Sequence, residues 1–365
     1  MSTTINNKSR LQWADTARGF AILLVLIGHS CPPDAFNVLI YAFHMPLFFL
    51  LSGIFLVLDK PLKPILYKRI RTILVPFFVY NIVLLFSDWC IVAFSPNYHT
   101  PIDIQSRLLG TLTGWRGGIF SSSLWFLPAL FMAQWAVIAC YRKGQKCHKH
   151  SYLITTFLWF MLTLLGIIYC QLIGIELPMS FDAALVASGF LIVGHQWMSH
   201  GISHMKGWPL LTTTIVFLLS AYGNYLIMGM GSNHVDMSTN TLGNIPFFYV
   251  GAITGSFLII RVSCILTNLP RNLRFVRGLQ WCGYHSLAIY CIHRIPMNLV
   301  IAFTNLVPWL NEPTVLSEGI RSAIIVVATV LFLIPAILIV NRWFPWTLGK
   351  SYTRDNHLFF STFPK

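Results

Sequence analysis

The sequence predicts an all-α fold, a polytopic membrane helical bundle of about ten transmembrane helices. Three observations support this prediction. Of the 365 residues, 56% are hydrophobic and 10% are charged, whereas soluble domains carry about 25% charged residues. Apolar segments of roughly 20 residues, the length that crosses about 30 Å of hydrocarbon, recur along the whole chain. The basic residues lie in short connections between alternate segments, as in multi-pass membrane proteins.

The apolar segments that are long enough to span a bilayer can be placed in order. They fall at residues 17–36, 39–58, 72–94, 121–141, 152–172, 181–199, 209–229, 243–262, 282–305 and 319–341. The first follows a basic N-terminus, but no small-residue cleavage site comes after it. We therefore interpret it as a retained span and not as a signal peptide.

Basic residues concentrate on one side of this topology. They cluster in residues 8–18, 60–71, 142–149, 261–277 and 342–365. The positive-inside rule therefore places both termini in the cytoplasm. We expect a cytoplasmic N-terminal segment (1–16), one membrane domain (17–341) and a cytoplasmic C-terminal tail (342–365).

Composition also bears on partners and metals. The formal net charge of +14 would suit nucleic acid, but basic residues in short loops between apolar spans indicate membrane topology instead. We expect a lipid bilayer as partner and no nucleic acid. The eight cysteines lie mostly inside apolar segments and lack the spacing of a disulfide framework or a zinc site. No metal is therefore expected.

A charged pair and a histidine share one face of the first segment. Arg18 and His29 are 11 residues apart, which returns to within about 20° of the same helical face and separates them by roughly 16 Å. Asp15 lies one turn before Arg18. The topology puts Arg18 at the cytoplasmic surface and His29 near mid-membrane. Ionisable groups inside a membrane are costly, which favours a function over a histidine that only bonds to a neighbouring helix.

The second and third segments add a histidine and a basic cluster. His44 lies near the outer surface and either has a function or satisfies the carbonyl that Pro46 leaves free. Farther along the second segment, Ser52-Gly53 is typical of close helix packing. The cluster Lys68, Arg69 and Arg71 stands at the cytoplasmic mouth of the third segment. It is either a topology anchor or a phosphate clamp beside Arg18.

The ninth segment carries a second polar stripe. Ser286, Tyr290 and His293 are spaced i, i+4 and i+7 and therefore share a face. His293 lies about 18 Å into the segment, which matches the depth expected for His29. The two histidines, with Tyr290 and Arg294, indicate a polar cavity. The aromatic run 125–128, by contrast, reads as lipid-facing or interfacial.

Taken together, these motifs resemble the acyltransferase-3 superfamily, and the branch is similar to bacterial fucose 4-O-acetylase-like membrane O-acetyltransferases. The resemblance covers nearly the whole chain in order. Its motifs are Asp15-x-x-Arg18-Gly19, Arg18-x10-His29, Phe43-His44-Met45-Pro46, Ser52-Gly53, Lys68-Arg69-Ile70-Arg71, Leu124-Trp125-Phe126-Leu127-Pro128 and Ser286-Leu287-Ala288-Ile289-Tyr290.

The resemblance implies about ten spans in the bacterial inner (cytoplasmic) membrane and an O-acetyltransferase activity. Acetyl would pass from cytoplasmic acetyl-CoA to a hydroxyl of a cell-envelope or exported glycan. By position, the family's catalytic Arg-x10-His pair falls on Arg18 and His29. The family's donor-binding basic pair falls on Lys68 and Arg71, where lysine replaces the usual arginine. Since lysine makes no bidentate phosphate contact, a contribution from Arg69 stays open.

Resemblance and residue pattern together give one mechanism. Acetyl-CoA would dock against Arg18, Lys68, Arg69 and Arg71, with its pantetheine arm between the first, second and ninth segments. His29 would act as the general base on the acceptor hydroxyl or would carry the acetyl group transiently.

The remaining site residues have supporting roles in this mechanism. Asp15 would orient Arg18, and Tyr290 or His293 would stabilise the oxyanion. His44 would meet a glycan or lipid-linked saccharide arriving from outside. A homodimer stays open.

Two other function classes fit buried histidine and arginine residues. The first is a secondary transporter of a glycan or anionic metabolite, although the sequence lacks the paired broken-helix repeats common in transporters. The second is an inactive membrane assembly factor, which the intact polar motifs disfavour.

Overall fold

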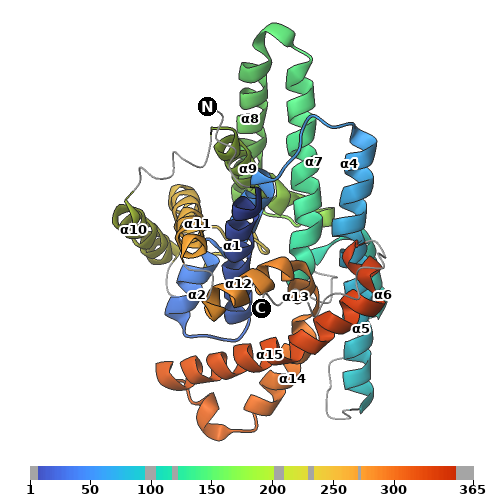
Figure 1. Cartoon of the computed structure of the whole chain (residues 1–365), viewed down its shortest axis with the longest axis vertical. Helices are drawn as coiled ribbons and strands as arrows, with labels where there is room; N and C mark the ends of the chain where they lie inside the picture. Colours follow the sequence, from blue (N-terminus) through green and yellow to red (C-terminus); the bar gives the residue numbers. More distant parts are fainter. Residues whose placement is uncertain are drawn as a thin grey trace.

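The computed structural model describes residues 7–94, 104–116, 122–200, 209–228, 234–269 and 273–350. Within these ranges the chain is a bundle of helices joined by short turns, and a single β-bridge joins Asp236 to Thr241 (Figure 1). The predicted all-α fold is therefore confirmed. The α-helices are α1 (Asn7–Gly28), α2 (Asp34–Tyr41), α3 (His44–Ile54), α4 (Leu62–Arg69), α5 (Val75–Phe94), α6 (Ile104–Thr113), α7 (Phe126–Gln145), α8 (Ser151–Leu172), α9 (Phe181–His200), α10 (Leu210–Met228), α11 (Ile245–Asn268), α12 (Arg274–Tyr284), α13 (Ser286–Ile292), α14 (Arg294–Thr304) and α15 (Val315–Trp343).

Long apolar helices identify the chain as a multi-pass membrane protein. Eight helical stretches among the described residues are long and apolar enough to cross a bilayer. They are Asp34–Ile54, Leu62–Cys90, Ser123–Gln145, Ser151–Leu172, Pro178–Met198, Leu210–Met228, Ile245–Asn268 and Val315–Trp343. Only helices and closed barrels satisfy their backbone hydrogen bonds in lipid, so these stretches are the spans of a helical bundle.

The span predicted over 282–305 is a bent pair of helices, which counts as a ninth span when the pair is taken as one. Helices α13 and α14 meet at His293 with an angle of 53°. Pro296 explains the bend, because proline has no N–H and its ring clashes with the carbonyl four residues earlier. That carbonyl belongs to Ile292, the last residue of α13.

The prediction of one span over 17–36 is wrong. Helix α1 starts earlier, at Asn7, and ends at Gly28, while residues 34–36 belong to the next helix, α2. Pro32 and Pro33 stand in the break and cannot continue a helix. The first half of α1 is polar and the second half is apolar. Among the described residues this measure finds eight spans, or nine with the bent pair, in keeping with a polytopic helical bundle.

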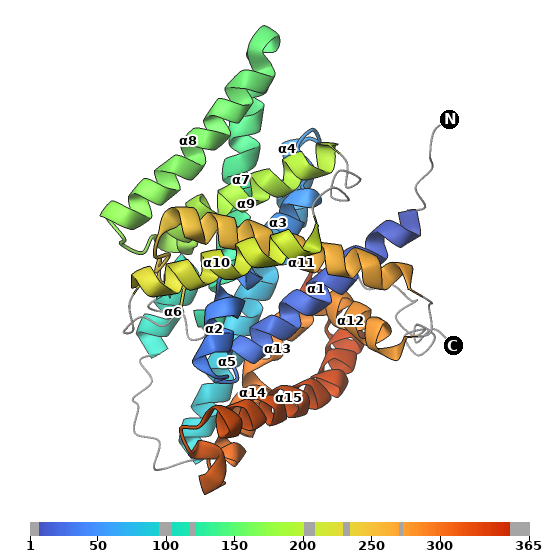
Figure 2. The same ribbon diagram turned by 90° about the vertical axis from the view of Figure 1, so that its left-hand side faces the viewer.

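Helix α1 lies near the centre of the bundle, packed against α12, α11 and α3 (Figures 1 and 2). Two glycines allow it to cross α12 at very short range. A Cβ atom at Gly19 would collide with the carbonyl of Leu279, and one at Gly283 would collide with the carbonyl of Asp15. Small residues at such crossings are typical of membrane helices, because close backbones maximise van der Waals contact.

Two glycines also allow α3 and α9 to pack at very short range. A Cβ atom at Gly53 would collide with the carbonyl of Leu191, and one at Gly194 would collide with the carbonyl of Leu50. The interpretation of Ser52-Gly53 as a close-packing pair is therefore confirmed for the glycine.

The helix ends alternate between two sides of the bundle. In Figure 2 the N-terminal end of α1 and the C-terminal ends of α9 and α11 lie toward the right. The C-terminal ends of α8 and α10 and the N-terminal end of α11 lie toward the left.

Candidate active site

A cavity of about 150 Å³ opens between α1, α3, α7, α13 and the π-helical turn η1 (Ile70–Leu74). Its lining unites four of the sequence motifs in one place. Polar side chains come from Arg18, Ser52, Thr72 and Ser286, aromatic ones from Phe48, Phe126 and Tyr290, and aliphatic ones from Leu51, Ile73, Leu127, Leu130 and Leu287.

The cavity has a polar end and an aromatic end. The Arg18 guanidinium lies 5.1 Å from the ring centre of Phe55, which caps the C-terminus of α3, so Arg18 stands at that end of the helix. Phe48 lies farther back along α3, and its ring centre is 5.7 Å from that of Phe126. Phe126 in turn lies 5.7 Å from Tyr290, edge to face. These three rings form the end opposite Arg18.

Arg18 is held in place by its own helix and by α3. Its Nη1 donates to Oδ1 of Asp15 over 3.2 Å, which confirms the contact expected from their spacing of one turn. The Phe55 ring adds a cation–π contact on the other side. The guanidinium remains partly exposed, so it keeps donors for an anion in the cavity.

The basic cluster adjoins the cavity through η1. Thr72 and Ile73 line the cavity from this turn, and Lys68 and Arg69 lie one turn before them. The backbone carbonyl of Arg71 packs against Gly349. Lys68 is exposed, whereas Arg69 and Arg71 are partly buried. A π-helical turn within an α-helix is frequent at functional sites.

The two histidines predicted to share a depth lie together. The rings of His29 and His293 are stacked with their centres 5.5 Å apart. His293 is fully buried, its Nδ1 bonds to the carbonyl of Tyr290 over 2.8 Å, and its Nε2 has no hydrogen-bond partner. His29 follows the last residue of α1 and is partly accessible, and its N–H donates to the Val25 carbonyl over 3.1 Å.

Neither histidine lines the cavity. They stand beyond its aromatic end, since the ring centres of Tyr290 and His293 are 6.3 Å apart. The Tyr290 hydroxyl itself donates to the carbonyl of Ser123, just before α7. In this structure Tyr290 thus already donates its hydroxyl proton to a backbone carbonyl.

His44 approaches the same region from the far side through Tyr41. The His44 ring is buried, and its Nδ1 bonds to the carbonyl of Ile40 over 2.8 Å. The Tyr41 ring packs edge-on against His44, with centres 4.8 Å apart, and its hydroxyl lies 3.4 Å from the Gly28 carbonyl, next to His29. His234 packs on Tyr41 at 4.1 Å, a contact that the sequence did not indicate.

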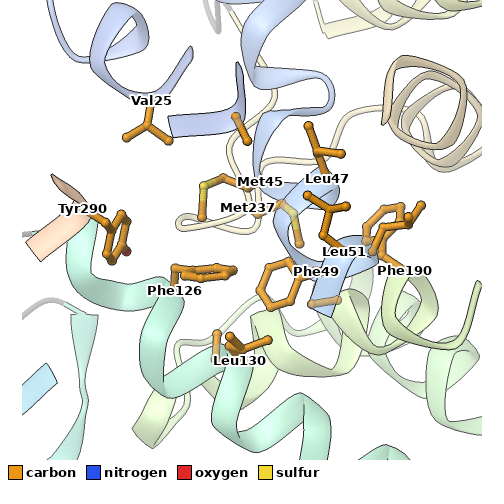
Figure 3. Close-up of a cluster of buried hydrophobic side chains, with 14 of the residues drawn as sticks. Val25, Met45, Leu47, Phe49, Leu51, Phe126, Leu130, Phe190, Met237 and Tyr290 are labelled. Atoms are coloured by element: carbon orange, nitrogen blue, oxygen red, sulfur yellow. The ribbon is translucent and has the colours of Figure 1, made fainter. Parts of the chain in front are cut away.

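Phe126 corrects one sequence interpretation. The run 125–128 was interpreted as lipid-facing or interfacial, but Phe126 is only 7% exposed and forms part of the cavity. Figure 3 shows its ring between those of Tyr290 and Phe49. In the sequence, the only signal for a role of this run at the site was that it is one of the motifs that carry the family resemblance.

No group of three or more metal-ligating side chains occurs among the residues with a described structure. The side chains gathered at the cavity and beyond its aromatic end offer the chemistry of arginine, hydroxyl groups and imidazoles. An arginine at one end suits a phosphate or thioester donor, and neutral imidazoles at the other suit proton transfer from a hydroxyl.

Comparison with known families agrees with this arrangement. The acyltransferase domain that defines the acyltransferase-3 family matches residues 11–341, nearly the whole chain. No curated protein and no solved structure matches the chain. The matched range contains most of α1, the basic cluster, the cavity and the stacked pair of histidines. The chain belongs to the acyltransferase-3 family and is a membrane acyltransferase.

Proposed function

We propose that the protein is an O-acetyltransferase of the bacterial inner membrane, which transfers acetyl from cytoplasmic acetyl-CoA to a hydroxyl of a cell-envelope or exported glycan. One observation carries the proposal. The cavity has an arginine at one end, and beyond its other end lies a pair of stacked histidines. A donor and an acceptor can therefore reach the histidines from opposite sides.

The polar end of the cavity suits the donor. Arg18, with Lys68 and Arg69 on the turn beside it, offers cationic donors for the phosphates of acetyl-CoA. Arg71 adds positive charge from η1. The hydroxyls of Ser52 and Ser286 can bond to the amides of the pantetheine arm as it passes into the apolar part of the cavity.

In the proposed transfer step, His29 is the base that accepts the proton of the acceptor hydroxyl. His29 takes the proton of the acceptor hydroxyl while that oxygen attacks the thioester carbonyl. When the tetrahedral intermediate collapses, the carbon–sulfur bond breaks and the CoA thiolate takes the proton back from His29. The products are the acetyl ester and free CoA. His29 is partly accessible, as a base that meets a substrate must be.

The neighbours of His29 position it and accommodate the acceptor. His293 packs against the His29 ring and restricts its rotation. His44 and Tyr41 lie on the acceptor side, where ring faces can stack on a sugar and polar edges can bond to its hydroxyls. Asp15 keeps Arg18 directed toward the donor.

Loss of His29 or Arg18 tests the proposal. His29→Ala and Arg18→Ala are expected to reduce transfer of radiolabelled acetyl from acetyl-CoA at least about 100-fold, since general base catalysis alone supplies that much. The measurement uses membranes that contain the full chain, together with mass spectrometry of surface glycans from cells with and without the gene.

His195→Ala is the matched control. His195 is a partly buried histidine of α9 that packs on Trp159, with ring centres 5.9 Å apart, and does not line the cavity. Its replacement is expected to leave transfer unchanged. Normal glycan acetylation in both the His29 and Arg18 variants would overturn the mechanism. Glycan transport without acetyl transfer would favour the transporter.

A further inference from the structure

The aromatic end of the cavity separates the donor side from the histidine pair. Tyr290 lines the cavity, while His293 and His29 lie beyond it. An acyl group held in the cavity must therefore pass Tyr290 and its neighbour Phe126 to reach His29 (Figure 3). The space between these two rings limits what can pass.

Both rings are held firmly. Phe126 is 7% exposed and packs edge-on against Phe49, with centres 4.8 Å apart, as well as against Tyr290. Tyr290 is 6% exposed, and its hydroxyl is bonded to the carbonyl of Ser123, three residues before Phe126. Moving either ring aside breaks close packing or a buried hydrogen bond, so the opening is narrow.

The walls next to these rings are apolar. Leu51, Leu127 and Leu130 supply them, and no carboxylate or amide side chain lines the cavity within the described residues. Next to these leucines an uncharged aliphatic acyl group is favoured, because a free carboxylate on the acyl chain would be buried among them without a hydrogen-bond donor.

We propose that Phe126 determines specificity for the acyl group, and that it admits short uncharged acyl chains to His29 and excludes longer ones. This inference rests on the proposed acyl-CoA donor. It adds the residue that selects among acyl-CoA donors by the length of their acyl chain. A rigid apolar pocket discriminates about 10- to 200-fold per methylene group, so one ring suffices to set a preference.

Binding of two inert donor analogues tests the role of Phe126. The probes are the ethyl and hexyl thioethers of CoA, which have no acyl group to transfer. Isothermal titration on the detergent-solubilised full chain gives the ratio of their dissociation constants, hexyl over ethyl. This ratio is expected to exceed 1 in the wild type and to fall at least about tenfold in Phe126→Ala.

A milder substitution of Phe126 and a control substitution outside the cavity complete the test. Phe126→Leu preserves apolar packing and is expected to lower the ratio by a smaller factor, even if the alanine variant does not fold. Phe131→Leu changes a ring on the same helix that packs on Trp135 at 6.1 Å and does not line the cavity, so its ratio should equal that of the wild type.

The outcomes separate this inference from the proposed function. If the ethyl analogue binds but Phe126→Leu and a folded Phe126→Ala leave the ratio unchanged, Phe126 does not select the acyl group. If neither analogue nor acetyl-CoA binds the wild type, the acyl-CoA donor itself is wrong, and the inference fails with it.

Discussion

At the scale of single residues, His285 supports the polar end of the cavity. It directly precedes Ser286, is 3% exposed, and accepts at Nδ1 a hydrogen bond from the Asn341 amide over 3.4 Å. Lys350 donates to the other end of that amide over 2.6 Å. Burial and the Lys350 charge lower the pKa of His285 from 6.5 to about 4. The folded protein therefore keeps this imidazole neutral.

Stability should consequently depend on pH through His285. Between pH 6.5 and about 4 the unfolded chain binds a proton at this position and the folded chain does not, so stability falls as the pH drops through this window. The loss reaches roughly 3 kcal/mol at the lower end. The apparent melting temperature in detergent, measured across this window, reports it. His285→Gln should flatten the profile, and equal slopes for wild type and variant would refute the assignment.

Residue pairs fixed by local helical spacing were predictable. The contact of Asp15 with Arg18 follows from a spacing of one turn, and that of His29 with His293 follows from equal depth. Phe126 was not predictable in the same way. Lipid and protein core are both apolar, so an aromatic side chain has the same sequence signature whether it faces one or the other.

At the scale of helices, the α1–α12 crossing positions Arg18 beside the cavity. Gly283 packs against the backbone of α1 at Asp15, one turn before Arg18. On α12 itself, Gly278 has open space where a Cβ atom would stand. Gly278 and Gly283 thus lie on the same helix, but only Gly283 faces the backbone of a neighbouring helix.

This contrast gives a matched pair of variants. Gly283→Ala is expected to force the two helices apart, at a cost of about 1–3 kcal/mol for overpacking, and to reduce acetyl transfer because Arg18 shifts with α1. Gly278→Ala should be neutral or stabilising, since alanine favours a helix by about 1 kcal/mol over glycine. Apparent melting temperatures and acetyl transfer measure both. Equal effects at the two positions would contradict a role for the close crossing.

The ends of the helices were harder to predict than their presence. Apolar residues continue through the break after His29, so hydropathy joined residues 17–36 into one span, although Pro32 and Pro33 mark the true end. The bend at His293 was missed for the same reason, since Pro296 lies inside an apolar run. Hydropathy reports burial in lipid and says little about helix continuity.

At the scale of the whole molecule, a buried ion pair joins segments that are distant in sequence. Arg116 donates to both carboxylate oxygens of Asp182 over 2.9 and 2.5 Å, and Asn240 donates to the same carboxylate over 2.5 Å. Asp182 is fully buried and Arg116 is 6% exposed. The pair ties the residues after α6 to the start of α9 and to the turn before α11. Nothing in the sequence pairs charges 66 residues apart.

Breaking this pair on one side should destabilise the whole bundle. Asp182→Ala removes the buried partner of Arg116 and leaves its guanidinium only the partly exposed carboxylate of Glu176, 3.7 Å from Nε, at an expected cost of about 3–5 kcal/mol, and the double variant with Arg116→Leu should recover part of it. Asp88→Ala is the control, because Asp88 and its partner Arg107, 3.6 Å away, are both partly exposed and such pairs contribute about 0–1 kcal/mol. Thermal unfolding of the detergent-solubilised protein compares the variants. If Asp182→Ala lowers the melting temperature no more than Asp88→Ala does, the network does not hold these segments together.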